Sequence, residues 1–189
     1  MEYIKMEAYE YDHNLANRYT RKEMKNARGN PIFQTKNAIK DHDAGHLGEI
    51  IFDRWLMDKD IEYEWVNNLN GIGDKGRDFI IHKNCFSGKL KSYVIDVKTA
   101  NPDTFVDEIG DGYRFKIAEQ QYKKHPSVDF FFNIQLDPDW EHAYLIGGLH
   151  YDMVPIFGVK RHDNNVNPSY DIPLIDLTHP DIWLQELLK

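Results

Sequence analysis

Three residues with the chemistry of a catalytic site, Asp78, Asp96 and Lys98, fall on or directly after two short runs that have the composition of β-strands. The runs are residues 78–82 and 93–97, and the segment between them contains the Ser-Gly pair of a turn, so the sequence predicts an antiparallel hairpin. With the turn centred near that pair, residues whose numbers sum to about 174 face each other, which places Asp78 opposite Asp96. Side chains alternate along a strand, so Lys98 shares a face with Asp96.

Asp96 interrupts an otherwise apolar run, because Val94, Ile95 and Val97 surround it. A carboxylate in such a strand costs free energy unless it is paired or holds a metal ion. One surface of the hairpin would thus carry two carboxylates and an ammonium, and we interpret it as an active site. The alternative is a buried Asp–Lys ion pair without catalytic use, although such pairs stabilise a fold poorly compared with apolar packing.

Asp78, followed after a hairpin by Asp96-Val97-Lys98, resembles the signature of the PD-(D/E)XK nuclease superfamily. The resemblance implies an α/β, restriction-endonuclease-like core with a mixed central sheet flanked by helices, in the order helix, three antiparallel strands, helix and strand. It also implies Mg²⁺-dependent hydrolysis of phosphodiester bonds. Arg77 stands where the superfamily has its first proline, and Asp96 replaces the commoner glutamate, which leaves Asp74 as a rival for the first acid.

The same resemblance implies a set of metal ligands: Asp78, Asp96, the backbone carbonyl of Val97, and Glu49 from the helix before the hairpin. Oxygen ligands of this kind suit Mg²⁺, with Mn²⁺ as a substitute. Lys98 would orient the attacking water or stabilise developing charge.

Exonuclease-like branches of the superfamily carry a glutamine near the site, on the helix after the motif. Gln120 and Gln121 are the matching residues, and Gln121 is the one that we expect to be catalytic.

A basic segment, residues 14–40, departs from the acidity of the chain. It holds seven basic residues against one acid, Glu23, which is a local net charge of about +6. Basic residues beside an acidic metal site suit an enzyme that holds a polyanion, so we expect Arg18, Arg21 and Lys22 to contact substrate, together with Arg77. An ordinary solvated helix is the alternative.

Residues 41–59 have an apolar stripe at helical spacing, and Glu49 lies on the other side of that predicted helix. His42 and His46 are four residues apart, a spacing that also suits a pair of zinc ligands. The sequence shows no His-Glu-x-x-His motif and no obvious third ligand for them, so we expect His46 to contact substrate instead. A zinc hydrolase that uses both histidines is the alternative.

The length predicts one domain over residues 1–189. The resemblance implies that it is nuclease-like, with a basic N-terminal extension at 1–40, a core at 41–149 and a C-terminal extension at 150–189. The predicted helices are residues 14–27, 41–59, 113–124 and 181–188, and the further strands are residues 61–66, 128–136, 142–149 and 172–177.

Composition restricts the partners and the location. The formal net charge of −8 disfavours non-specific binding of nucleic acid by the whole molecule, so the local basic segment matters more. A single cysteine, Cys85, excludes an internal disulfide and suits a cytoplasmic protein. No apolar run reaches the roughly 20 residues that span a membrane. We therefore expect DNA as the partner, with RNA left open; a nuclease-fold protein that binds DNA or another protein without cutting is the main alternative.

Overall fold

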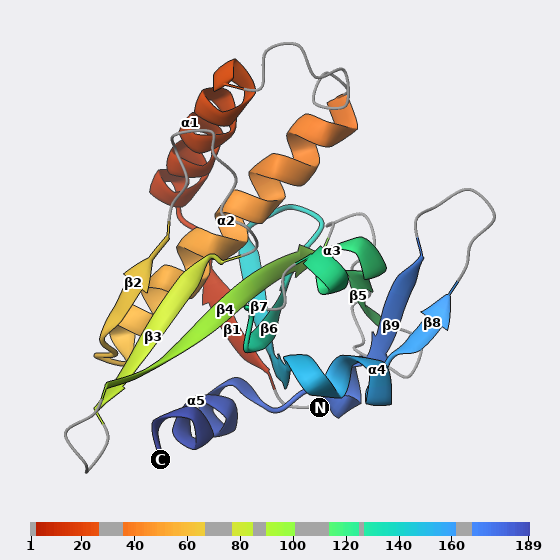
Figure 1. Ribbon diagram of the computed structural model, residues 1–189. Helices are drawn as coiled ribbons and strands as arrows, with labels where there is room; N and C mark the ends of the chain where they lie inside the picture. Colours follow the sequence, from red (N-terminus) through yellow and green to blue (C-terminus); the bar gives the residue numbers. More distant parts are fainter. Residues whose placement is uncertain are drawn as a thin grey trace.

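The computed structural model describes residues 3–26, 36–66, 77–84, 90–100, 114–124, 127–161 and 168–189. It is an α/β fold in which a mixed six-stranded sheet is flanked by helices, with a second sheet of three strands beside it (Figure 1). The strands are β1 (Ile4–Glu7), β2 (Tyr63–Trp65), β3 (Phe79–Asn84), β4 (Leu90–Ala100), β5 (Arg114–Ala118), β6 (Phe130–Leu136), β7 (His142–His150), β8 (Val159–Arg161) and β9 (Ser169–Pro173). The α-helices are α1 (Glu10–Asn26), α2 (Lys36–Asp58), α3 (Glu119–Lys124), α4 (Val154–Phe157) and α5 (Pro180–Leu188).

β3 and β4 form the predicted hairpin in the predicted register. Phe79 lies opposite Ile95 and Asn84 opposite Leu90, so the numbers of the partners sum to 174 along the whole ladder. β2 pairs antiparallel with β3, whereas β6 lies parallel to β4 on its other side. The strand order β1-β7-β6-β4-β3-β2 therefore places β4 in the interior of the sheet.

The central sheet is buried on both faces, as two consecutive residues of β6 illustrate. Phe132 packs against Phe52 of α2 and Trp183 of α5, with ring centroids 4.7 and 5.0 Å away. Phe131 points to the opposite face and belongs to a second core together with residues of β5, α4 and β9. Since side chains alternate along a strand, the continuous apolar run of β6 is what a strand covered on both faces requires. The prediction of a buried central strand there is confirmed.

α1 and α2 run side by side and extend beyond the sheet (Figure 1). Two features fix the start of α1. β1, just before it, pairs with β7, and the first turn of α1 contains a buried acid, Asp12, that makes polar contacts. Asp12 accepts a hydrogen bond from the backbone N–H of Tyr9 at 2.9 Å and forms an ion pair with Arg54 of α2. The helix α1, which carries the basic residues, is therefore held against α2, the helix that carries His42, His46 and Glu49.

Two predicted elements were wrong. Residues 113–124 were expected to form one helix, but the segment forms strand β5 followed by the short helix α3. Phe115 and Ile117 are buried and Lys116 between them is exposed, which is the alternation of a strand, and β5 pairs with β9 in the smaller sheet. The predicted edge strand at residues 172–177 is in fact the end of β9 followed by a 3₁₀ turn, Leu174–Asp176.

The other predicted helices and strands are present with shifted ends; α1 begins at Glu10 and α2 at Lys36. Residues 67–76, 85–89 and 101–113, which include Cys85, lie outside the described residues. Within the described part of the chain, no helix combines the length and the apolar character needed to cross a membrane.

Candidate active site

A pocket of about 380 Å³ lies where α2 faces the second half of β4. The structure brings most of the predicted site residues to its wall, although they come from α2, the start of β3, β4 and α3. The predicted residues that line the pocket are His46, Glu49, Asp78, Asp96, Val97, Lys98 and Gln121.

Asp78 is buried immediately before β3, with 6% of its surface exposed. Its backbone N–H donates to the carbonyl of Ile95 at 3.0 Å, which continues the ladder of the hairpin. Its Oδ2 accepts a hydrogen bond of 2.7 Å from the backbone N–H of Val97. The hairpin thus fixes the direction of this carboxylate through the backbone of the neighbouring strand.

Asp96 and Lys98 lie on the same face of β4 and form an ion pair, with Lys98 Nζ 2.5 Å from Asp96 Oδ1. The Asp96 side chain is 1% exposed, whereas that of Lys98 is 23% exposed. The ammonium therefore lies on the solvent side of the carboxylate, where it can contact a molecule in the pocket. The predicted juxtaposition of two carboxylates and an ammonium is present.

α2 approaches β4 closely because one of its residues is a glycine. A Cβ added at Gly48 would lie 1.9 Å from Thr99 Oγ1 and 3.0 Å from Thr99 Cβ, which no side chain tolerates without movement. One residue further along the helix, Glu49 faces the pocket, and its Oε1 lies 4.0 Å from His46 Nδ1. Gly48 therefore sets the distance between Glu49 and the carboxylates of the hairpin.

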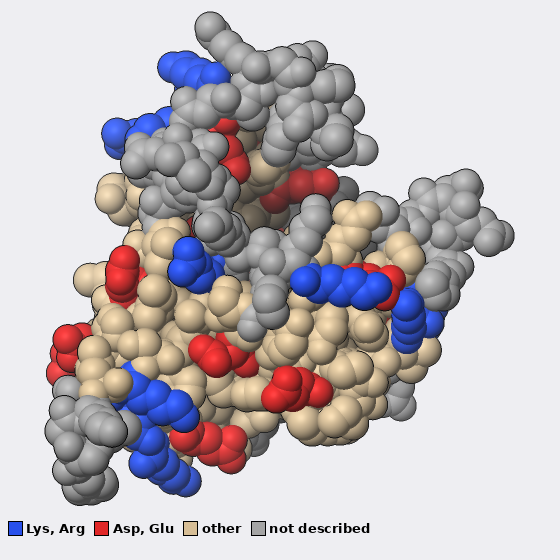
Figure 2. Space-filling model, in the orientation of Figure 1, with Lys and Arg blue, Asp and Glu red and all other residues tan. Residues whose placement is uncertain are grey.

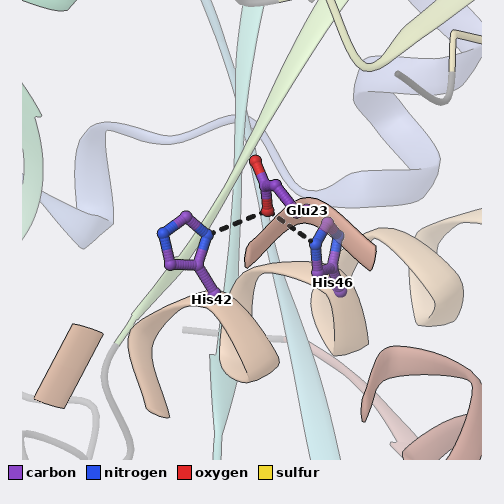
Figure 3. Close-up of side chains that lie close together, drawn as sticks. All are labelled: Glu23, His42 and His46. Atoms are coloured by element: carbon purple, nitrogen blue, oxygen red, sulfur yellow. Dashed lines mark hydrogen bonds and ion pairs between the residues drawn. The ribbon is translucent and has the colours of Figure 1, made fainter. Parts of the chain in front are cut away.

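Glu23 of α1 is a site residue that the sequence analysis missed. Its Oε2 lies 3.1 Å from His42 Nδ1 and 3.1 Å from His46 Nε2, so one carboxylate oxygen joins both histidines of α2 (Figure 3). Glu23 is the only acid among the basic residues of segment 14–40, and this isolated position is the one feature of the sequence that could have marked it as a site residue.

The hydrogen bonds of this cluster shift the pKa values of Glu23 and His46. Hydrogen bonds with His42 and His46 hold the pKa of Glu23 far below its ordinary value. Burial by itself would lower the pKa of His46, but the hydrogen bond with Glu23 and the nearby charge of Glu49 outweigh burial, so that pKa is raised. The cluster thus favours a charged Glu23 carboxylate facing a positive charge on the imidazole of His46.

The pocket is strongly acidic. The described residues that line it include five carboxylates and one ammonium, that of Lys98, which gives a formal charge of −4 with neutral histidines. The five acids are Glu23, Asp41, Glu49, Asp78 and Asp96.

The basic side chains of α1 lie elsewhere. Arg18, Arg21 and Lys22 are exposed and do not line the pocket. Blue atoms occupy the outer surface over α1 at the upper left of Figure 2, and red atoms lie in the recess beneath them. A polyanion held by α1 would therefore meet a negative pocket next to it, and cations bound in the pocket would remove that repulsion.

Four further residues named in the sequence analysis have different placements. Gln120 and Gln121 are both exposed, and of the two only Gln121 lines the pocket. Arg77 is partly buried beside Asp78 in sequence but does not line the pocket. The rival first acid, Asp74, lies outside the described residues.

Comparisons of the chain with protein-family models, with curated proteins and with solved structures found no match.

Proposed function

We propose that this protein is a Mg²⁺-dependent nuclease that hydrolyses phosphodiester bonds of DNA, with a PD-(D/E)XK type of site. The observation that carries the proposal is the position of Asp78, Asp96 and Lys98, which line one pocket together with Glu49. Paired carboxylates and an adjacent ammonium are the groups that metal-assisted phosphodiester hydrolysis uses.

The arrangement of the main sheet supports a restriction-endonuclease-like core. Along the chain, α2 is followed by the antiparallel strands β2, β3 and β4, then by α3 and by β6, which lies parallel to β4. This is the order that the superfamily resemblance implies, with β5 inserted before α3. β1, β7 and the smaller sheet are additions to that core.

The donor groups of the pocket fit Mg²⁺. Asp78 and Asp96 offer carboxylate oxygens, the ligand type that Mg²⁺ prefers, and the pocket has an excess of negative charge that a divalent cation would balance. A bound Mg²⁺ supplies an activated water and neutralises charge that develops on the phosphate.

The protein side chains would stabilise charge on the phosphate and orient the substrate. Lys98, paired with Asp96 and partly exposed, is placed to stabilise developing negative charge on a phosphate. Glu49 offers a further oxygen from α2, and Gln121 an amide from α3. The exposed basic residues of α1 would hold the flanking phosphates, so that the scissile bond is oriented towards the carboxylates.

Cleavage should require Mg²⁺ or Mn²⁺, and Ca²⁺ should support binding with little cleavage, because its looser coordination positions a water less well. The measurement is digestion of linear and closed-circular DNA side by side, with calorimetric titration of each ion. An exonuclease spares the circle and an endonuclease cuts both substrates. DNA binding without cleavage in any ion would favour the alternative of a non-cleaving nuclease-fold protein.

The Asp78→Asn variant should lose calorimetric Mg²⁺ binding, since Asp78 offers a carboxylate that is already oriented by the backbone of Val97. The matched variant is Asp74→Asn. If Asp74→Asn loses binding and Asp78→Asn keeps it, Asp74 is the first acid.

Replacing Arg18, Arg21 and Lys22 together by glutamine should weaken DNA binding for all sequences alike. Each phosphate contact contributes about 0.9 to the slope of log affinity against log salt on duplex DNA, so the slope should flatten by roughly two to three units. The measurement is equilibrium binding in Ca²⁺ over a salt series. Metal binding should be unchanged, because none of the three residues lines the pocket.

The matched control replaces three exposed lysines elsewhere in the chain, Lys91, Lys116 and Lys189, by glutamine. It changes the net charge by the same amount, so it separates a local contact from a general electrostatic effect. Equal slopes for the α1 variant and the wild type would show that α1 is a solvated helix and that DNA follows another path.

A further inference from the structure

Glu23, His42 and His46 form a compact group of one carboxylate oxygen and two imidazole nitrogens at the wall of the pocket, and all three ligand atoms lie within 4.8 Å of one another. We propose that they bind a divalent transition-metal ion of the zinc type, at a site separate from the carboxylates of the hairpin. The site would join α1 to α2 beside the substrate pocket. It does not depend on the nuclease activity proposed above.

The distances within the group suit a shared ion. In a tetrahedral zinc site with ligand bonds of 2.0–2.1 Å, neighbouring ligand atoms lie about 3.3 Å apart. Glu23 Oε2 lies 3.1 Å from His42 Nδ1 and 3.1 Å from His46 Nε2. Figure 3 shows the carboxylate of α1 facing both rings of α2, so an ion could enter with small movements of the side chains.

Neighbouring residues hold the ligands in place. His42 and His46 are four residues apart in α2, so their side chains share one face of the helix. The ring of Tyr19 packs edge-on against that of His46, with the centroids 5.8 Å apart. Glu49 Oε1 lies 4.0 Å from His46 Nδ1, the nitrogen that faces away from Glu23; this is beyond hydrogen-bond distance, but it places a negative charge behind the ring.

The two groups of donors in the pocket favour different ions. Imidazole nitrogens suit Zn²⁺ and similar transition metals, whereas the all-oxygen set of Asp78 and Asp96 suits Mg²⁺. Three protein ligands would leave a fourth position, and since Glu23, His42 and His46 all line the pocket, a water or a substrate atom would fill it from there. The sequence alone left the two histidines without a third ligand, and α1 supplies it.

The test is a calorimetric titration of the chelator-treated full-length chain with Zn²⁺, repeated with Co²⁺ while the visible spectrum is recorded. One Zn²⁺ should bind per chain, and Co²⁺ should give the absorption of a tetrahedral site. Glu23→Gln and His42→Ala should each weaken Zn²⁺ binding by more than the about 10- to 100-fold that loss of an outer-shell partner costs. Both side chains are partly exposed, so both variants should stay folded without metal, and the loss of the contacts between Glu23 and the histidines should lower the melting temperature only modestly.

Two control variants locate the ion. His150→Ala removes a partly exposed histidine that lies 3.7 Å from a carboxylate of Asp152, away from the pocket, and should leave Zn²⁺ binding unchanged. Asp96→Asn should also retain it, because Asp96 belongs to the other set of donors. Absence of Zn²⁺ binding in the wild type would overturn the proposal. Unchanged affinity in both Glu23→Gln and His42→Ala, or loss of affinity in Asp96→Asn, would overturn it equally.

Discussion

Asp96→Asn and Lys98→Gln should each lower the turnover number for DNA cleavage by at least about 100- to 1,000-fold, the usual cost of removing one group that stabilises a transition state. DNA affinity in Ca²⁺ should change little, because groups that act on the transition state contribute to rate rather than to ground-state binding. The measurement is single-turnover cleavage of a labelled duplex in Mg²⁺. Rates within about tenfold of wild type for both variants would remove Asp96 and Lys98 from the catalytic site.

The two residues form an ion pair in which the Asp96 carboxylate is buried and the Lys98 ammonium is partly exposed, so stability has to be separated from catalysis. Lys98→Gln leaves the Asp96 carboxylate without its ammonium, and an uncompensated buried charge is destabilising. The double variant Asp96→Asn/Lys98→Gln removes both charges and should recover stability while remaining inactive. Lys91→Gln is the matched control on the same strand, since Lys91 is exposed and does not line the pocket, and it should cleave like the wild type.

Gly48→Ala should destabilise the protein by about 1–3 kcal/mol, the typical cost of an overpacked contact, although alanine favours helix formation more than glycine does. The added Cβ would meet Thr99, so α2 would have to move away from β4 or Thr99 would have to shift. Since α2 carries Glu49 and both histidines, we expect lower cleavage activity as well. Urea unfolding and cleavage assays measure the two effects.

Gly45→Ala is the matched control for the unfolding measurement, because it lies in the same helix one turn earlier and an added Cβ there meets nothing within 4 Å. Gly45 itself lines the pocket, so this variant is not used as a control for cleavage. It should be neutral, or stabilising by up to about 1 kcal/mol, from helix propensity alone. Adding Thr99→Ala to Gly48→Ala removes most of the clash and should recover part of the stability. Equal stability of the two glycine variants would mean that the contact between α2 and β4 adapts at no cost.

The hairpin and its candidate site could be predicted because the determining signals are local. A turn and two strands of alternating side chains fix the register, and the register alone places Asp78, Asp96 and Lys98 near one another. The approach of α2 was predictable in part, from an apolar stripe that had to face a core. The strand β6 was also predictable, since its continuous apolar run is typical of a strand buried on both faces.

Other features depend on contacts between distant segments. Glu23 reaches the site only because α1 packs along α2. The sequence of α1 alone does not predict which residues of another helix Glu23 will face. The strand β5 was mistaken for helix because its alternation covers only five residues and precedes a true helical turn. Its partner β9 lies far along the chain, and pairing with β9 decides the conformation of a segment that short.

The pairing of β1 with β7 also affects how the chain folds during synthesis. Ile4 lies opposite Leu145, so the first strand can take its place only after most of the chain has left the ribosome. Contacts between segments so far apart in sequence form slowly, because the entropy of closing a long loop is lost before the contacts contribute favourable energy. The start of α1 is tied down by this pairing, and α1 supplies Glu23. A nascent chain that has already formed the β3–β4 hairpin would therefore still lack a firmly anchored α1, and would complete its pocket only once β7 is available.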